Sequence, residues 1–265
     1  MKELVCDMCG SNNIIKQDGL FVCQACNTKY SIEEARKMMF GEVVEVEGTV
    51  KIDSSDELSN LYELARRARE TNDTKYALVY YEKILIKDPS SWEAQFCVGL
   101  YRLYNYDKIV VEILDDFKSS LKSSVLVIKD KLTDDDEKTQ ALAFITNELI
   151  DLCSDIFDVN YEYLKKIRSS SNRLVGRPHA ILMSTTNILF DYGDSVIGIN
   201  DKSRNFAIGC WETAIDWGAT FNYVFNRSTK NEHKKLIETY TQKIQQYNPQ
   251  YEAPKFKTSI TRVLW

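Results

Sequence analysis

The sequence predicts a mainly α-helical protein that begins with a small β unit built around cysteines. Two C-x-x-C pairs flank a hairpin pattern near the N-terminus. From about residue 56, apolar residues recur at spacings of three and four, as they do along one face of a helix. The 265 residues include only 10 Gly and 4 Pro, a composition that favours long helices over a turn-rich β fold.

The N-terminal cysteines have the spacing of a metal site. Two C-x-x-C turns can direct four sulfurs at one ion, and four thiolates make the closed tetrahedral shell of a structural zinc site. The segment between the pairs contains two short strand patterns around Asp18-Gly19, which is a hairpin signal. We therefore expect one structural zinc ion per chain, and iron held by the same sulfurs is the alternative. The expected ligands are Cys6, Cys9, Cys23 and Cys26.

The residue after each cysteine pair supports this reading. Gly10 and Asn27 occupy matching places, where a tight turn needs a residue that tolerates positive φ. Gly10, together with the cysteines, Phe21 and Tyr30, gives the segment a resemblance to the TFIIB-type zinc ribbon over a small part of the chain. The whole chain also resembles bacterial proteins in which such a ribbon precedes a helical region, and this implies an architecture without an activity.

The zinc ribbon is expected to span residues 1–40 and to end in a helix. Ser31 with Glu34 three residues later forms a capping-box pattern. Residues 41–55 then alternate acidic and β-branched side chains, which predicts an acidic linker or an exposed strand. The composition change at this point marks the domain boundary.

Residues 56–248 are expected to form a helical body. Its first part, residues 56–106, resembles a tetratricopeptide repeat, and Gly99 keeps a small residue in the next helix. The later helices predict irregular repeats or a bundle, and residues 249–265 predict an extended tail. We expect this tail to dock on the helical body or to pair with residues 42–52. The positions that match the repeat are Leu61, Leu64, Ala65, Ala68, Ala77, Tyr81, Ile84 and Pro89.

No catalytic motif is present, and we expect no enzyme activity and no small-molecule substrate. The chain has no G-x-S-x-G, P-loop or G-x-G-x-x-G pattern. Its two histidines, His179 and His233, lie on different predicted helices. The remaining cysteines, Cys97, Cys153 and Cys210, each lie in an apolar helical stretch and are expected in the core.

Charge and hydropathy limit which compartment and which kinds of partner the sequence favours. No apolar run reaches membrane-spanning length and no signal-peptide pattern is visible, so we expect a cytoplasmic protein with reduced thiols. The sequence favours a protein or peptide partner, because helical repeats present extended binding surfaces. The alternative is a nucleic-acid-associated regulator, which would use the ribbon and the basic C-terminal half. Basic and acidic residues balance within the ribbon, and this argues against phosphate binding there.

Overall fold

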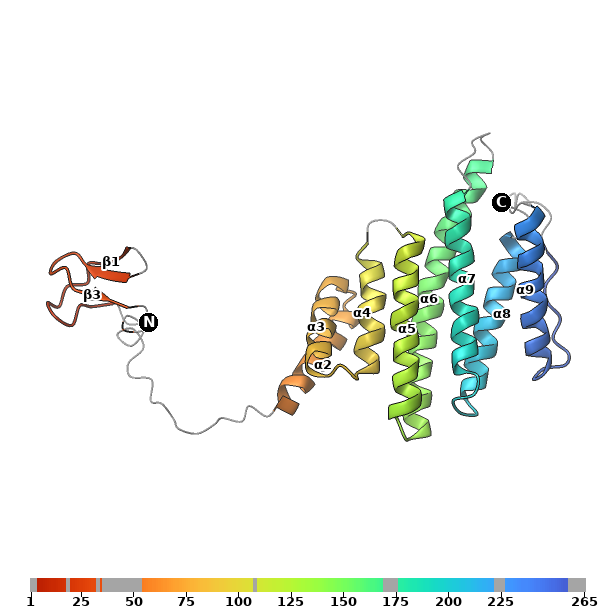
Figure 1. Ribbon diagram of the computed structural model, residues 1–265, viewed down its shortest axis with the longest axis horizontal. Helices are drawn as coiled ribbons and strands as arrows, with labels where there is room; N and C mark the ends of the chain where they lie inside the picture. The colour runs from red at the N-terminus through yellow and green to blue at the C-terminus, as the bar shows by residue number, and fades with distance from the viewer. Residues whose placement is uncertain are drawn as a thin grey trace. The chain divides into compact units, whose positions relative to one another are not determined.

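The computed structural model describes residues 4–17, 20–31, 34, 54–106, 109–168, 176–221 and 227–256. The chain divides into two compact units, Met1–Ile52 and Asp53–Trp265. The first contains a small sheet and the second contains the helices, so the fold is mainly α with a β element near the N-terminus (Figure 1).

The first unit is a three-stranded antiparallel sheet. Its strands are β1 (Ile14–Gln17), β2 (Leu20–Cys23) and β3 (Lys29–Tyr30), in the order β1-β2-β3. Gln17 pairs with Leu20 at the predicted hairpin, and Ile14 pairs with Cys23 at the other end of the ladder. This register brings the second cysteine pair back beside the chain that follows the first pair.

The predicted capping box after the sheet is confirmed. The Glu34 backbone N–H donates to the Ser31 hydroxyl at 3.2 Å, and the Ser31 N–H donates to the Glu34 carboxylate at 2.7 Å. These reciprocal bonds satisfy two N–H groups that a helix start would leave unpaired. The helix predicted after this capping box and most of the acidic segment at 41–55 lie outside the described residues.

The second unit is an array of helices in chain order (Figure 1). Each substantial helix–helix contact joins neighbours or next-but-one neighbours, such as α5 with α7 and α6 with α8. Contacts of this short range are typical of a helical repeat, in which each unit packs only on those beside it. The helices are α2 (Ser54–Glu70), α3 (Thr74–Lys87), α4 (Trp92–Tyr104), α5 (Val111–Lys131), α6 (Asp135–Arg168), α7 (Gly176–Val196), α8 (Ser203–Phe221) and α9 (Arg227–Gln245).

Short polar side chains set several helix starts. Asp73 accepts from the Tyr76 N–H before α3, Ser91 accepts from the Ala94 N–H before α4, and Asp134 accepts from the Glu137 N–H before α6. Each bond satisfies a backbone donor that has no partner within the helix. Pro178 lies in the first turn of α7, where its missing N–H removes nothing from the helix.

The first helical pair packs as its repeat-like pattern predicts. Ala65 and Ala77 are fully buried between α2 and α3, and Tyr81 fills the space beside them with no exposed surface. Leu64 differs, because 40% of its surface is exposed. α2 is the first helix of the described array, so no earlier helix among the described residues covers Leu64.

The helices α4 and α5 also pack closely against each other. A Cβ built on Gly99 of α4 would lie 2.7 Å from the Ser120 Cβ of α5. Real Cβ atoms do not approach other atoms so closely, so the glycine is what permits this helix spacing. Cys97, Cys153 and Cys210 are fully buried, as predicted.

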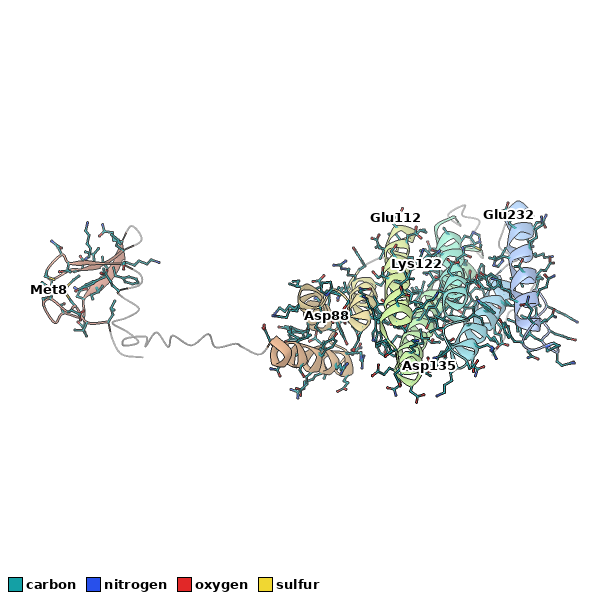
Figure 2. The ribbon with its side chains drawn as sticks, turned by 60° about the horizontal axis from the view of Figure 1, so that its bottom comes forward. Met8, Asp88, Glu112, Lys122, Asp135 and Glu232 are labelled. Carbon is teal, nitrogen blue, oxygen red and sulfur yellow. The ribbon has the colours of Figure 1, made fainter. Side chains whose placement is uncertain are left out.

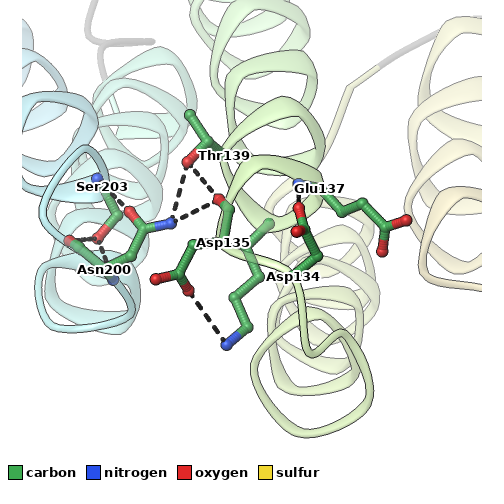
Figure 3. A network of polar contacts seen from close by, with 7 residues as sticks. Asp134, Asp135, Glu137, Thr139, Asn200 and Ser203 are labelled. Carbon is green, nitrogen blue, oxygen red and sulfur yellow. Dashed lines mark hydrogen bonds and ion pairs between the residues drawn. The ribbon is translucent and has the colours of Figure 1, made fainter.

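A polar network joins the start of α6 to the connection between α7 and α8 (Figure 3). The Asn200 amide donates to the Asp135 carbonyl at 3.1 Å and to the Thr139 hydroxyl at 3.0 Å. Its side-chain oxygen accepts from the Ser203 N–H at 2.8 Å. Asn200 therefore caps α8 and binds α6 with one side chain.

The described part of the tail lies on the helical unit. Residues 251–256 have no helix or strand, and Tyr251, Ala253 and Phe256 pack against the core. The Gln245 amide donates to the Tyr251 carbonyl at 3.0 Å. Residues 257–265 and the pairing proposed for them with residues 42–52 lie outside the described residues.

Charged side chains lie on the surface of the helical unit. Glu112, Lys122 and Glu232 are exposed on it (Figure 2). Among the described helices, none combines the length and apolar character needed to cross a membrane.

Candidate metal centre

Two matching turns position the four N-terminal cysteines. In the first turn, the Gly10 N–H donates to the Cys6 carbonyl and the Cys6 N–H donates to the Ser11 carbonyl, both at 2.8 Å. In the second turn, Asn27 donates to Cys23 and Cys23 donates to Thr28, both at 2.9 Å. The same bonds at the same spacing mean that both C-x-x-C segments adopt one conformation.

That conformation requires positive φ after each pair. Gly10 has φ of 69° and Asn27 has φ of 60°, in the left-handed region that the sequence predicted for both. Glycine enters this region without steric cost, and asparagine is among the few other residues that do so readily. The Gly and Asn therefore set the direction in which each pair of sulfurs points.

The four sulfurs form one cluster. The Sγ atoms of Cys6 and Cys26 are 3.5 Å apart, and those of Cys9 and Cys23 are 3.6 Å apart. All four lie within 4.8 Å of one another. A tetrahedral site with Zn–S bonds of about 2.3 Å has S–S edges of about 3.8 Å, so the spacing fits a single ion. It is too long for a disulfide, and all four are free thiols.

The cluster is half enclosed by a very small core. Cys6 and Cys23 are buried with Tyr30, and Ile14 and Phe21 pack against them. Cys9 and Cys26 are exposed. So little apolar surface cannot hold a fold of this size by itself, whereas a bound structural metal contributes roughly 10–16 kcal/mol.

Hydroxyl groups contact two of the sulfurs. The Tyr30 hydroxyl lies 2.9 Å from the Cys6 Sγ, and the Thr28 hydroxyl lies 3.1 Å from the Cys26 Sγ. The bond from Tyr30 lowers the pKa of Cys6 to about 6, and the same bond raises the pKa of Tyr30 to about 12. Tyr30 therefore stabilises the thiolate, which is the form that binds metal.

The other candidate residues remain apart. Burial raises the pKa of Cys210 to about 12, so this thiol is not activated. His179 lies on α7 and His233 on α9. Within the described ranges, the four N-terminal cysteines are the only group of three or more Cys, His, Asp or Glu residues placed to share an ion.

One feature of the helical unit was not predicted. Residues from α2, α4 and α6 line a cavity of about 430 Å³, which contains Arg66, Arg69 and the largely buried Glu93. The spacing of three between the arginines places them on one helix face, and this signal was available in the sequence. The position of Glu93 opposite them was not, because it depends on how α4 packs on α2.

Comparisons with models of protein families, with curated proteins and with solved structures find no match to this chain.

Proposed function

We propose that this protein is a non-catalytic, zinc-binding interaction protein, an adaptor or scaffold, with a TFIIB-type zinc ribbon and a tetratricopeptide-like body. The four-cysteine cluster is the observation that carries the metal assignment. Four sulfur ligands leave no open coordination position, so the ion has a structural role.

Zinc is the metal that suits this site best. Thiolates in tetrahedral geometry select zinc or iron, and zinc needs no redox partner. The two buried and two exposed cysteines would hold the ion at the edge of the sheet, where it joins the two turns. The ion then takes the place of a hydrophobic core in the first unit.

The helical unit supplies the interaction surface. Its closely packed helix pairs are neighbours or next-but-one neighbours in chain order, and α2, α4 and α6 together line one cavity. An array of this kind exposes side chains from several helices along one face, which is how repeat proteins bind peptides and other proteins. A protein or peptide partner in the cytoplasm is the proposed ligand.

Metal analysis of the purified full chain tests the first half of the proposal. We expect one zinc per chain, and loss of zinc in a Cys23→Ser variant. Cys153→Ala is the matched control, because it removes a thiol outside the cluster and should retain full zinc. Chelation should leave the far-ultraviolet helix signal of the second unit intact. A metal-free protein, or an iron-type visible spectrum, would refute the zinc assignment.

Reconstitution with a purified partner tests the second half. Proteins captured from a native extract by the full chain would be purified and mixed with it, and we expect a defined complex at a fixed ratio. Random-sequence DNA is the comparison probe. If DNA binds tightly and weakens steeply with salt, while no protein forms a defined complex, the nucleic-acid alternative replaces the proposal.

A further inference from the structure

The cavity between α2, α4 and α6 has features of a binding site. Its volume of about 430 Å³ is in the range of ligand pockets, which is roughly 300–1,000 Å³. The lining residues that matter for recognition are Arg66, Arg69, Trp92, Glu93, Gln140 and Phe144.

Glu93 fixes one of the two arginines. Its side chain is only 9% exposed. One oxygen accepts from the Arg66 Nε at 3.2 Å and the other from the Arg66 terminal nitrogen at 2.7 Å. The Tyr81 hydroxyl also donates to Glu93, at 2.9 Å. Because Arg66 and Glu93 neutralise each other, Arg66 has little charge left for a ligand.

Arg69 is different. Its side chain is 27% exposed, and its nearest ion-pair contact to Glu93 is long, at 3.9 Å. Its side chain donates no hydrogen bond within the part of the chain that the structure describes. Its guanidinium lies 4.6 Å from the centre of the Phe144 ring, which holds it in place. A guanidinium carries five N–H donors, so Arg69 offers an oriented cationic fork to the cavity.

Aromatic rings lie beside this fork. Trp92 and Phe144 meet edge to face, with ring centroids 6.1 Å apart. No hydrogen bond from the Trp92 indole occurs among the described residues. Aromatic and arginine side chains around a desolvated pocket are the usual composition of an interaction hot spot.

We propose that this cavity binds an acidic segment of a partner protein, in which an Asp or Glu adjoins an aromatic or large aliphatic residue. The carboxylate would accept the two N–H groups of Arg69, and the apolar side chain would pack on Trp92 and Phe144. This inference rests on the proposed interaction function, for which it names the site and the partner chemistry.

Glu137 allows a test of whether the cavity prefers a negatively charged ligand. It lines the same cavity and is exposed, and its carboxylate points away from the Asn200 network (Figure 3). A second negative charge at the rim opposes an acidic ligand. Removing it should therefore strengthen binding, whereas removing the charge of Arg69 should weaken it.

The probe is a display library of random 12-residue peptides, selected on the full-length protein. We expect enrichment of peptides with an acidic residue next to an aromatic or large aliphatic one. For a synthetic peptide from the selection, replacing that Glu with Gln should weaken binding by about tenfold or more. Arg69→Gln should produce a similar loss. Glu137→Gln should tighten binding.

Arg67→Gln is the matched control, because Arg67 lies two positions before Arg69 in α2, is exposed and does not line this cavity. Phe144→Leu is a second test variant, to be used if circular dichroism shows that Arg69→Gln is not folded. It keeps an apolar side chain but removes the ring under Arg69, and it should weaken the peptide with Glu more than the one with Gln.

The outcomes separate the two claims. If no peptide is enriched, the proposed peptide-binding function of this surface fails, and the inference fails with it. If enriched peptides lack acidic residues, or bind equally to the parent and to Arg69→Gln, the interaction function stands and the assignment of this cavity is wrong.

Discussion

The Tyr30 hydroxyl lies 2.9 Å from the Sγ of Cys6, within the buried cluster of the first unit. Tyr30→Phe removes this donor while keeping the ring in place. Partners of metal ligands typically contribute 10- to 100-fold in affinity, so we expect zinc affinity to fall by about that factor. Competition with a coloured zinc chelator measures it. Equal affinities would show that the bond does not support the metal site.

Tyr81 is the central side chain between α2 and α3. Tyr81→Ala should lower the free energy of unfolding by roughly 3–5 kcal/mol, because it leaves a large cavity and removes a donor from Glu93. Tyr80→Ala is the neighbouring control, since Tyr80 is only partly buried, and it should have a smaller effect. Denaturant unfolding measures both. Similar values for the two variants would contradict the assigned helix face.

Two helical glycines should respond in opposite directions. Gly99→Ala places a methyl group 2.7 Å from Ser120 and should lower stability by about 1–3 kcal/mol. A Cβ on Gly209 meets nothing within 4 Å, so Gly209→Ala should raise stability by roughly 0.5–1 kcal/mol through backbone entropy. Thermal unfolding of both variants checks the signs. Stabilisation by Gly99→Ala would mean that α4 and α5 are not so close.

His233 is buried, and burial lowers its pKa from 6.5 to about 4. Between these values the unfolded chain binds a proton that the folded chain does not, so stability falls as pH drops through this window. His233→Gln lacks this titration. Between pH 7 and pH 5, the parent should lose about 2 kcal/mol more stability than the variant. Denaturant unfolding at both pH values gives the comparison, and equal losses would refute the burial of a neutral imidazole.

The tail contributes apolar contacts at Tyr251, Ala253 and Phe256. Deleting residues 249–265 should lower the thermal midpoint by about 5 °C or more, because these partly buried side chains each contribute on the order of 1 kcal/mol. Deleting only residues 257–265 leaves the three contacts and isolates the contribution of the last segment. If the longer deletion leaves the midpoint unchanged, the tail does not stabilise the helical unit.

The candidate metal ligands and the helical class could both be predicted from local patterns. Cys6, Cys9, Cys23 and Cys26 flank one hairpin and are close in the chain, so their spacing and the turn residues Gly10 and Asn27 already contain most of the geometry. Tyr81 was placed correctly because the spacing of apolar residues in a helix fixes which face is buried.

Contacts between helices that are far apart in the chain could not be predicted from local sequence patterns. Leu64 matches a large position of the repeat, yet 40% of its surface is exposed, because none of the described helices packs over it. Arg69, Glu93 and Phe144 come from α2, α4 and α6, and only the packing of these helices brings them to one cavity. The sequence by itself determined the cysteine spacing and the helical periodicity, because both depend on backbone geometry over a few residues. Tertiary packing decided which charges are neutralised and which face a cavity, because side chains far apart in the chain become neighbours only when the helices pack.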